Sequence, residues 1–308
     1  MNVAAMAVVV GLALLACLRV EASPRETLLE RLAERIQGRT ERAAPDTPPP
    51  GATIPYGSDP LQRLDVWPAQ GRQPAPLVMF VHGGGWKRGS KDSATSRWAP
   101  TYFPRQGYVY AAIDYRLVPT ATVEQQGEDV ALALKALLGR AREFGIDRER
   151  VVLMGHSAGA HLVALVGTDE RYLRAAGLGF ADVGGVIAID GAAYDVPAQI
   201  RAAGRMGLQT YTQAFGSDPA RQQALSPAYN AGAPNAPAFL LLYVQRPDGV
   251  RQAEALGRAL EAAGTAVEFG SFPGTGLRGH AQINRELGNP DYVATPVVNA
   301  WLEKLMGR

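Results

Sequence analysis

The segment Gly155-His156-Ser157-Ala158-Gly159 carries the clearest chemical pattern in the sequence. It matches G-x-S-x-G, in which a serine lies on a sharp turn between a strand and a helix and the flanking glycines leave room for that turn. The apolar run Val151–Met154 precedes the pattern, and an apolar helical segment from Ala158 to about Val166 follows it. This context predicts that Ser157 is a nucleophile, because a helix N-terminus also favours negative charge that develops nearby.

A second motif, His82-Gly83-Gly84-Gly85-Trp86, follows the apolar run Leu77–Val81. Consecutive glycines form poor strands or helices, but they let backbone N–H groups turn toward a ligand without obstruction by a Cβ atom. Acyl transfer needs such donors for the oxyanion of the tetrahedral intermediate. We therefore assign an oxyanion hole to the N–H groups of Gly84, Gly85 and Ala158, and we expect His82 to form structural hydrogen bonds rather than act as a base.

A serine nucleophile needs a general base, and His280 is the one histidine of the chain that lies beyond the predicted nucleophile helix. It lies in the glycine-rich segment 274–280, which follows the predicted strand Val267–Phe272 and which we expect to be a loop. His161 comes four residues after Ser157, and we expect it to be a packed helix residue.

The acid that orients His280 has two candidates, each at the end of a predicted strand. Asp248 follows the run Phe239–Val244, and Asp190 ends the run Val186–Ile189. Asp248 is the preferred prediction because it gives the order Ser, Asp, His on successive strand ends, and Asp190 is the alternative. Either carboxylate would hold the imidazole in the required tautomer and stabilise the imidazolium.

The elements that must position these residues alternate between strands and helices. Short apolar runs without alternation indicate strands that are buried on both faces, which predicts a mainly parallel sheet covered by helices, an α/β fold. Chemistry is expected at the carboxyl ends of such strands. The predicted strands are 61–67, 76–81, 108–113, 151–154, 186–189, 239–244 and 267–272, and further helices are predicted over 130–138, 253–263 and 297–305.

Composition excludes several other classes of protein. The chain has 308 residues, of which 47% are hydrophobic, so it is long enough for one large domain and too apolar to be mainly disordered. A formal charge of +2 gives no electrostatic case for binding nucleic acid. One cysteine excludes an internal disulfide framework, and the four histidines form no HExxH pair.

The N-terminal segment predicts export. The uncharged apolar run Val3–Leu18 is shorter than a membrane-spanning helix and resembles the core of a signal peptide, with a cleavage site after Ala22. Leu14-Leu15-Ala16-Cys17 also resembles a lipobox, which would attach the protein to a membrane by lipidation of Cys17. We therefore expect a signal over residues 1–22, a helix and proline-rich linker over 23–53, a catalytic domain over 54–308, and a periplasmic, secreted or lipid-anchored protein.

Together these motifs resemble the α/β-hydrolase fold, and within it the HGGGW carboxylesterases and the kynurenine formamidase-like arylformamidases. The segments that carry the resemblance, besides the two glycine motifs, are 56–66, Asp114-Tyr115-Arg116-Leu117, Gly145-Ile146-Asp147 and 280–284. The resemblance implies a Ser-His-Asp hydrolase that works without a metal or organic cofactor. The segment 246–252 is shorter than the acid loop that is usual in this family.

The expected function is cleavage of small or short-chain carboxylic esters through an acyl-enzyme, with a small-molecule ester as the partner and no nucleic acid. Residues 192–235 are long enough to form a lid. Trp86 and Tyr194 are weaker candidates for substrate contacts, as are Trp98, Met206, Tyr211 and Phe215. Two alternatives remain open, an arylformamidase and a hydrolase-fold binding protein that has lost catalysis.

Overall fold

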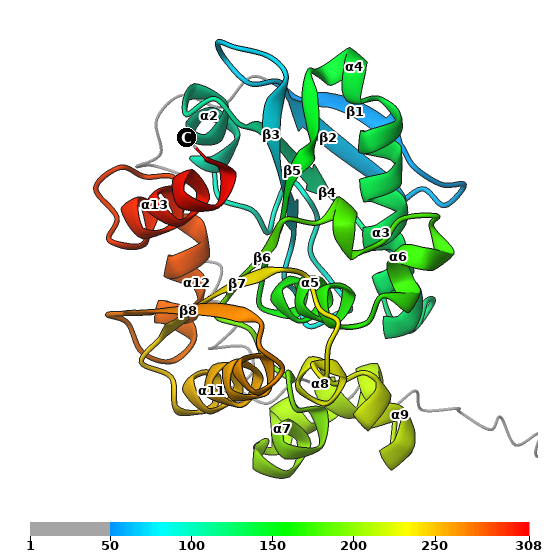
Figure 1. Cartoon of the computed structure of the whole chain (residues 1–308). Coiled ribbons are helices and arrows are strands. Elements are labelled where there is room, and N and C mark those ends of the chain that lie inside the picture. The colour runs from blue at the N-terminus through cyan, green and yellow to red at the C-terminus, as the bar shows by residue number, and fades with distance from the viewer. Residues whose placement is uncertain (1–49, 308) are drawn as a thin grey trace, which may run out of the picture. The chain divides into compact units, whose positions relative to one another are not determined.

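The computed structural model describes residues 50–307, and these residues form one eight-stranded sheet with helices on both faces (Figure 1). The predicted signal, the lipobox at Cys17, and the helix and most of the linker over 23–53 lie outside the described residues. No helix within 50–307 combines the length and the apolar character that crossing a membrane requires.

The strand order is β1-β2-β4-β3-β5-β6-β7-β8. The first two strands pair antiparallel, as do β2 and β4, and the remaining neighbours are all parallel. The strands are β1 (Ala52–Pro55), β2 (Arg63–Trp67), β3 (Ala75–Val81), β4 (Val109–Ile113), β5 (Ile146–His156), β6 (Gly185–Ile189), β7 (Ala238–Val244) and β8 (Ala266–Phe272). The predicted mainly parallel α/β fold is confirmed.

Strand β3 shows why the apolar runs fold in this way, since all seven of its side chains are buried. Leu77 and Met79 point into one hydrophobic core, and Val78 and Phe80 point into the other. A strand with period-two alternation would cover only one such core. Continuous apolar sequence therefore reflects a sheet that is covered on both sides.

The helices divide between those two cores. On one side lie α3 (Val123–Gly139), α4 (Ala141–Phe144), α5 (Ala158–Thr168), α6 (Arg171–Ala175), the 3-10 turn η1 (Phe180–Asp182) and α11 (Pro247–Ala262), and on the other lie α2 (Ala99–Arg105), α12 (Gly276–Arg285) and α13 (Ala294–Met306) (Figure 1). In the sequence, four helices separate β6 from β7: α7 (Val196–Ala202), α8 (Arg205–Phe215), α9 (Pro219–Ala224) and α10 (Pro227–Asn230). They fill the segment in which a lid is predicted.

Candidate active site

Ser157 lies on the turn from β5 to α5 in a backbone conformation that is rare for a side-chain-bearing residue, with φ 56° and ψ −117°. Such strain persists only where the surroundings impose it. A Cβ atom on Gly155 would lie 2.4 Å from the carbonyl oxygen of Gly159, and one on Gly159 would lie 2.1 Å from that of Val81. Both glycines of the motif are thus required by close backbone approach, and the turn holds the Ser157 hydroxyl at the carboxyl end of the sheet.

His280 reaches this hydroxyl from the other face of the sheet. Its Nε2 lies 3.0 Å from Ser157 Oγ, which fits a hydroxyl that donates to an unprotonated ring nitrogen. The segment around His280 is helix α12 rather than the expected glycine-rich loop. Gly279 allows this, since a Cβ there would lie 2.6 Å from the backbone of Gly274, so the helix packs closely against the preceding turn.

The carboxylate beside His280 belongs to Asp190, which corrects the prediction of Asp248. Nδ1–H of His280 donates to Asp190 Oδ2 at 2.5 Å. Asp190 directly follows β6, is fully buried, and has φ 42°, which turns its side chain inward from the strand end. Its backbone N–H donates to Leu242 O at 2.6 Å, and its Oδ1 accepts from the N–H of Val244 at 3.3 Å, so neighbouring β7 holds the carboxylate in place.

Asp248 binds an arginine instead. It is the second residue of α11, which begins only two residues after β7 ends, and its Oδ2 accepts from Arg246 Nη1 at 2.6 Å. Because the chain enters the helix so soon, there is no loop that could carry Asp248 to His280. The same arginine donates through Nε to Asp190 Oδ2 at 3.3 Å. Sequence reasoning gave Arg246 no role, and no motif marks it.

The electrostatics of the site favour a charged Asp190. Burial alone would raise the pKa of its carboxyl group, but the hydrogen bond from His280 and the charges of His280 and Arg246 outweigh burial and lower the pKa below its ordinary value. A carboxylate in this state accepts the Nδ1–H bond and leaves Nε2 of His280 to act as the base.

His156, which precedes the nucleophile, supports His280. Its ring packs against the His280 ring with centroids 4.5 Å apart, and its Nε2–H donates to the backbone oxygen of His280 at 2.9 Å. Burial and the neighbouring His280 lower the pKa of His156 to about 3, so the ring is neutral. Its place inside G-x-S-x-G is the signal that could have marked it.

The glycine motif forms a loop with positive φ at three successive residues. Gly84, Gly85 and Trp86 have φ of 130°, 60° and 63°. None of the backbone hydrogen bonds found in the described turns, loops and caps uses the N–H groups of Gly84, Gly85 or Ala158. Gly83 faces the nucleophile, since a Cβ on it would lie 3.0 Å from Ser157 Cβ.

His82 holds this loop by hydrogen bonds, as expected. Its Nδ1–H donates to Gly83 O at 2.7 Å, and its own backbone oxygen accepts from the Tyr115 hydroxyl at 2.9 Å. Because the C=O and N–H of a trans peptide point in opposite directions, fixing Gly83 O turns the N–H of Gly84 away from the His82 ring. Burial lowers the pKa of His82 to about 4, so the ring is uncharged at neutral pH, and the bond to Gly83 O requires the tautomer protonated at Nδ1.

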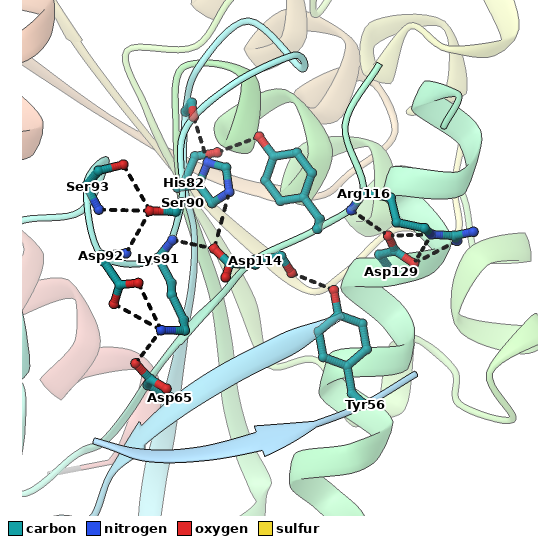
Figure 2. Close-up of polar contacts among 12 residues, drawn as sticks. Tyr56, Asp65, His82, Ser90, Lys91, Asp92, Ser93, Asp114, Arg116 and Asp129 are labelled. Atoms are coloured by element: carbon teal, nitrogen blue, oxygen red, sulfur yellow. Dashed lines mark hydrogen bonds and ion pairs between the residues drawn. The ribbon is translucent and has the colours of Figure 1, made fainter. Parts of the chain in front are cut away.

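A polar network behind the loop anchors it to the sheet (Figure 2). The backbone N–H of Lys91 donates to Asp114 at 2.6 Å, and the Lys91 ammonium group lies 2.7 Å from Asp65 on β2. Nearby, Arg116 pairs with the fully buried Asp129 at 2.7 Å. The family-like segment 114–117 therefore contributes support for the loop rather than a group that reaches Ser157.

Trp86 and Tyr194, expected as weak substrate contacts, are core residues. Trp86 is 2% exposed and packs on Tyr211 and Phe215 of α8, and its Nε1–H donates to His161 Nδ1 at 3.3 Å. Tyr194 is 1% exposed. His161 also donates to Leu225 O at 2.8 Å, which confirms it as a packed helix residue. The side chain of Met206 is not among those described.

No group of three metal-ligating side chains occurs within residues 50–307. The site brings together a hydroxyl, an imidazole and a carboxylate, and groups arranged in this way can carry out nucleophilic acyl transfer.

The fold is that of the α/β-hydrolases. Esterase B from Lactobacillus rhamnosis superposes with a TM-score of 0.71 at 22% identity, covering 92% of this chain and 94% of that one. Est2 from Thermogutta terrifontis, in its butyrate-bound structure, gives a TM-score of 0.63 at 21% identity, over 84% and 94% of the two chains.

Sequence relatives lead to the same group. Residues 64–180 match the family model BD-FAE. Esterase LipC of Mycobacterium tuberculosis is 38% identical over 38% of this chain, but the match spans only 30% of LipC. Kynurenine formamidase of Danio rerio is 25% identical over 83% of this chain and 81% of its own length. These matches confirm the resemblance to carboxylesterases and arylformamidases.

Proposed function

We propose that the protein is a carboxylic ester hydrolase in which Ser157 is the nucleophile, His280 the general base and Asp190 the orienting acid. The observation that carries the proposal is the unbroken hydrogen-bonded chain from Ser157 Oγ through both ring nitrogens of His280 to Asp190, with distances of 3.0 and 2.5 Å. The esterases among the relatives and structural neighbours support the reaction class.

The reaction proceeds in two steps on these groups. His280 Nε2 takes the hydroxyl proton while Ser157 Oγ attacks the ester carbonyl, and the oxyanion binds the N–H groups of Gly84, Gly85 and Ala158. The tetrahedral intermediate collapses when His280 returns the proton to the departing alcohol. Water then attacks the acyl-enzyme by the same route and releases the acid, which restores Ser157.

The substrate class that fits best is a small or short-chain ester. Helix α8 lies against the oxyanion loop, since a Cβ on Gly85 would lie 3.1 Å from the Thr210 methyl group. Trp86, Tyr211 and Phe215 fill the space behind the loop with packed rings. This packing restricts room beside the carbonyl, so we expect faster turnover of p-nitrophenyl acetate than of a long-chain ester.

An arylformamidase is the second candidate, and the full-length similarity to a kynurenine formamidase favours it. The same serine, histidine and aspartate can cleave a formamide, so substrate preference separates the two. Activity on N-formylkynurenine well above that on p-nitrophenyl acetate would support the formamidase and exclude the ester as the main substrate.

Ser157→Ala tests the nucleophile. We expect p-nitrophenyl acetate turnover to fall by at least about 10⁴-fold, with an unchanged circular dichroism spectrum, since the substitution removes one oxygen. A fluorophosphonate probe should label the wild-type protein and not the variant. Ser217→Ala, in the exposed turn between α8 and α9, is the control and should keep full activity. Absence of labelling of the wild-type protein would support the inactive binding protein instead.

The predicted export stays a proposal of its own, resting on the apolar run of residues 3–18. Mass spectrometry of the mature N-terminus distinguishes cleavage before Ser23 from lipidation of Cys17. An intact Met1 in the mature protein would contradict both.

A further inference from the structure

Arg246 lies between the two aspartates that follow β6 and β7. Its Nε is 3.3 Å from Asp190 Oδ2, and its Nη1 is 2.6 Å from Asp248 Oδ2. Asp190 Oδ2 is also the oxygen that accepts the His280 Nδ1–H bond, so one oxygen receives both donors. The arginine side chain is 13% exposed and that of Asp248 is 33% exposed, which places this ion pair at the edge of the buried site.

A cation in this position opposes catalysis unless it is compensated. During acyl transfer His280 becomes an imidazolium, and Asp190 stabilises that charge. A positive guanidinium on the same carboxylate oxygen weakens this stabilisation and disfavours a second positive charge nearby. Asp248 supplies the compensating negative charge. The Arg246–Asp248 pair then has no net charge and has little effect on the imidazolium of His280.

The histidine and tyrosine side chains around His280 and Asp190 carry no charge at working pH. His156 on β5 is neutral because burial and His280 lower its pKa to about 3. Burial raises the pKa of Tyr194, and it raises those of Tyr211 and Tyr292 to about 12, so these hydroxyls stay protonated. Ser157 is the remaining contact of the ring. Besides Asp190 itself, the charged side chains paired in this cluster are those of Arg246 and Asp248. Arg278 and Arg285 lie on α12, the helix that carries His280, and Glu286 is the residue after that helix.

We propose that Arg246 is a positioning residue for the triad acid and that Asp248 compensates its charge, so that the pair fixes the Asp190 carboxylate without suppressing the imidazolium of His280. This inference rests on the proposed function, since it assigns the two residues to the Ser157 site. Gly249 leaves the space for the contact, because a Cβ there would lie 3.0 Å from Arg246 Nη2 and 3.1 Å from Asp190 Oδ1.

The experiment compares four full-length variants, Asp248→Asn, Arg246→Gln, the double variant, and Arg246→Lys. The readouts are kcat/KM for p-nitrophenyl acetate and the rate of fluorophosphonate labelling, each measured from pH 4 to 9. Asp248→Asn leaves the charge of Arg246 uncompensated, which disfavours the imidazolium. The midpoint of the acidic limb of the pH–rate profile, where activity is half its plateau value, should therefore move down by about half a pH unit. Arg246→Gln removes the cation and should move the midpoint up by about the same amount.

The double variant removes both charges and should return the midpoint close to that of the wild type, with a lower plateau because Asp190 loses its donor. Arg246→Lys keeps the positive charge but loses the guanidinium group, which contacts Asp190 and Asp248 at the same time. It should therefore lower kcat with little movement of the midpoint. Circular dichroism and the unfolding midpoint of each variant establish folding. If Arg246→Gln does not fold, the contrast between the midpoint shift of Asp248→Asn and the nearly unmoved midpoint of Arg246→Lys remains decisive.

Midpoints that stay fixed in Asp248→Asn and Arg246→Gln, or that move in the same direction in these two variants, would overturn the proposal and leave the pair a structural ion pair. This failure differs from failure of the proposed function, in which the wild-type protein shows neither turnover nor labelling at any pH. An increase of the Asp248→Asn shift at low ionic strength would further support a charge effect, because Asp248 is partly exposed.

Discussion

Strands β6 and β7 run parallel as neighbours, and each is followed by an aspartate within a few residues. Asp190 comes directly after β6, turns inward at a positive φ and is fully buried against His280. Asp248 lies inside the first turn of α11, where its side chain is a third exposed and pairs with Arg246. The two strand ends thus differ in how the chain leaves the sheet, and this difference decides which carboxylate reaches the imidazole.

The contrast also separates two uses of an acidic residue. A buried carboxylate that accepts from an imidazole and from a backbone N–H group of the next strand is held in one geometry. A partly exposed carboxylate on an arginine contributes little stability and acts mainly through its charge. A position at the end of a strand marks an acidic residue as a candidate for the site. The path of the chain after the strand determines whether its carboxylate reaches the imidazole or pairs with an arginine.

The largest expected effect is that of Asp190→Asn. Because an amide cannot hold the required tautomer or stabilise the imidazolium, kcat for p-nitrophenyl acetate should fall by about 10³–10⁴-fold. Asp248→Asn should change the plateau of kcat by no more than about threefold, since its carboxylate touches neither His280 nor Ser157. Steady-state kinetics of the two variants at pH 8 give the comparison, and a greater loss in Asp248→Asn would reverse our assignment of the acid.

The buried histidines in and near the site should determine how the free energy of unfolding changes at acidic pH. His82, His156 and His161 are buried, and burial lowers their pKa values to about 4, 3 and 4 from 6.5. As pH falls below 6.5, these histidines become protonated in the unfolded chain but stay neutral in the folded protein. The free energy of unfolding therefore decreases down to about pH 4. We expect a loss of several kcal/mol in unfolding free energy over this window, measured by urea titration at each pH.

Asp190 loses its contribution to stability in a lower pH window than the histidines do. Its pKa is below the ordinary value of 3.8, so the stability it contributes is present above that value and is lost only as pH falls through the lower folded pKa. The acid loss between pH 6.5 and 4 should therefore persist in Asp190→Asn and Asp248→Asn. His161→Gln removes one titrating group and should reduce the slope, and an unchanged slope in that variant would contradict the assignment of the acid loss to buried histidines.

The sequence was sufficient to predict most of the sheet because its central strands are continuous apolar runs. The prediction of strand 76–81 agrees with Ala75–Val81, and that of 239–244 agrees with Ala238–Val244. Strand β1 was missed because it is mostly exposed and ends in a proline. Helix α2 was missed because it contains Pro100 and Pro104, which are typical of turns.

Within the site, the serine and the glycine loop could be predicted because local backbone geometry specifies them. His280 could be inferred from the small number of histidines, although glycines around it suggested a loop where α12 forms. For the acid, the sequence prediction preferred Asp248, whereas the structure places Asp190 beside His280. Both satisfy the strand-end rule, and the choice depends on the tertiary reach of His280 and on Arg246, which no local pattern reveals.

The smallest effect we predict is that of Gly249→Ala, which tests the contact between the two aspartate regions directly. Gly249 lies in the first turn of α11, where alanine would ordinarily stabilise a helix by up to about 1 kcal/mol. The new methyl group, however, would lie 3.0 Å from Arg246 Nη2 and 3.1 Å from Asp190 Oδ1, so one of them must move by a few tenths of an ångström. We expect kcat/KM to fall by roughly 3- to 10-fold while the protein stays folded, because small misplacements of catalytic groups reduce the rate.

Gly139→Ala, at the end of α3 with no atom within 4 Å of its added Cβ, is the matched control and should leave kcat/KM unchanged. Equal activity of the two variants would show that the position of Arg246 beside Asp190 has no influence on the triad.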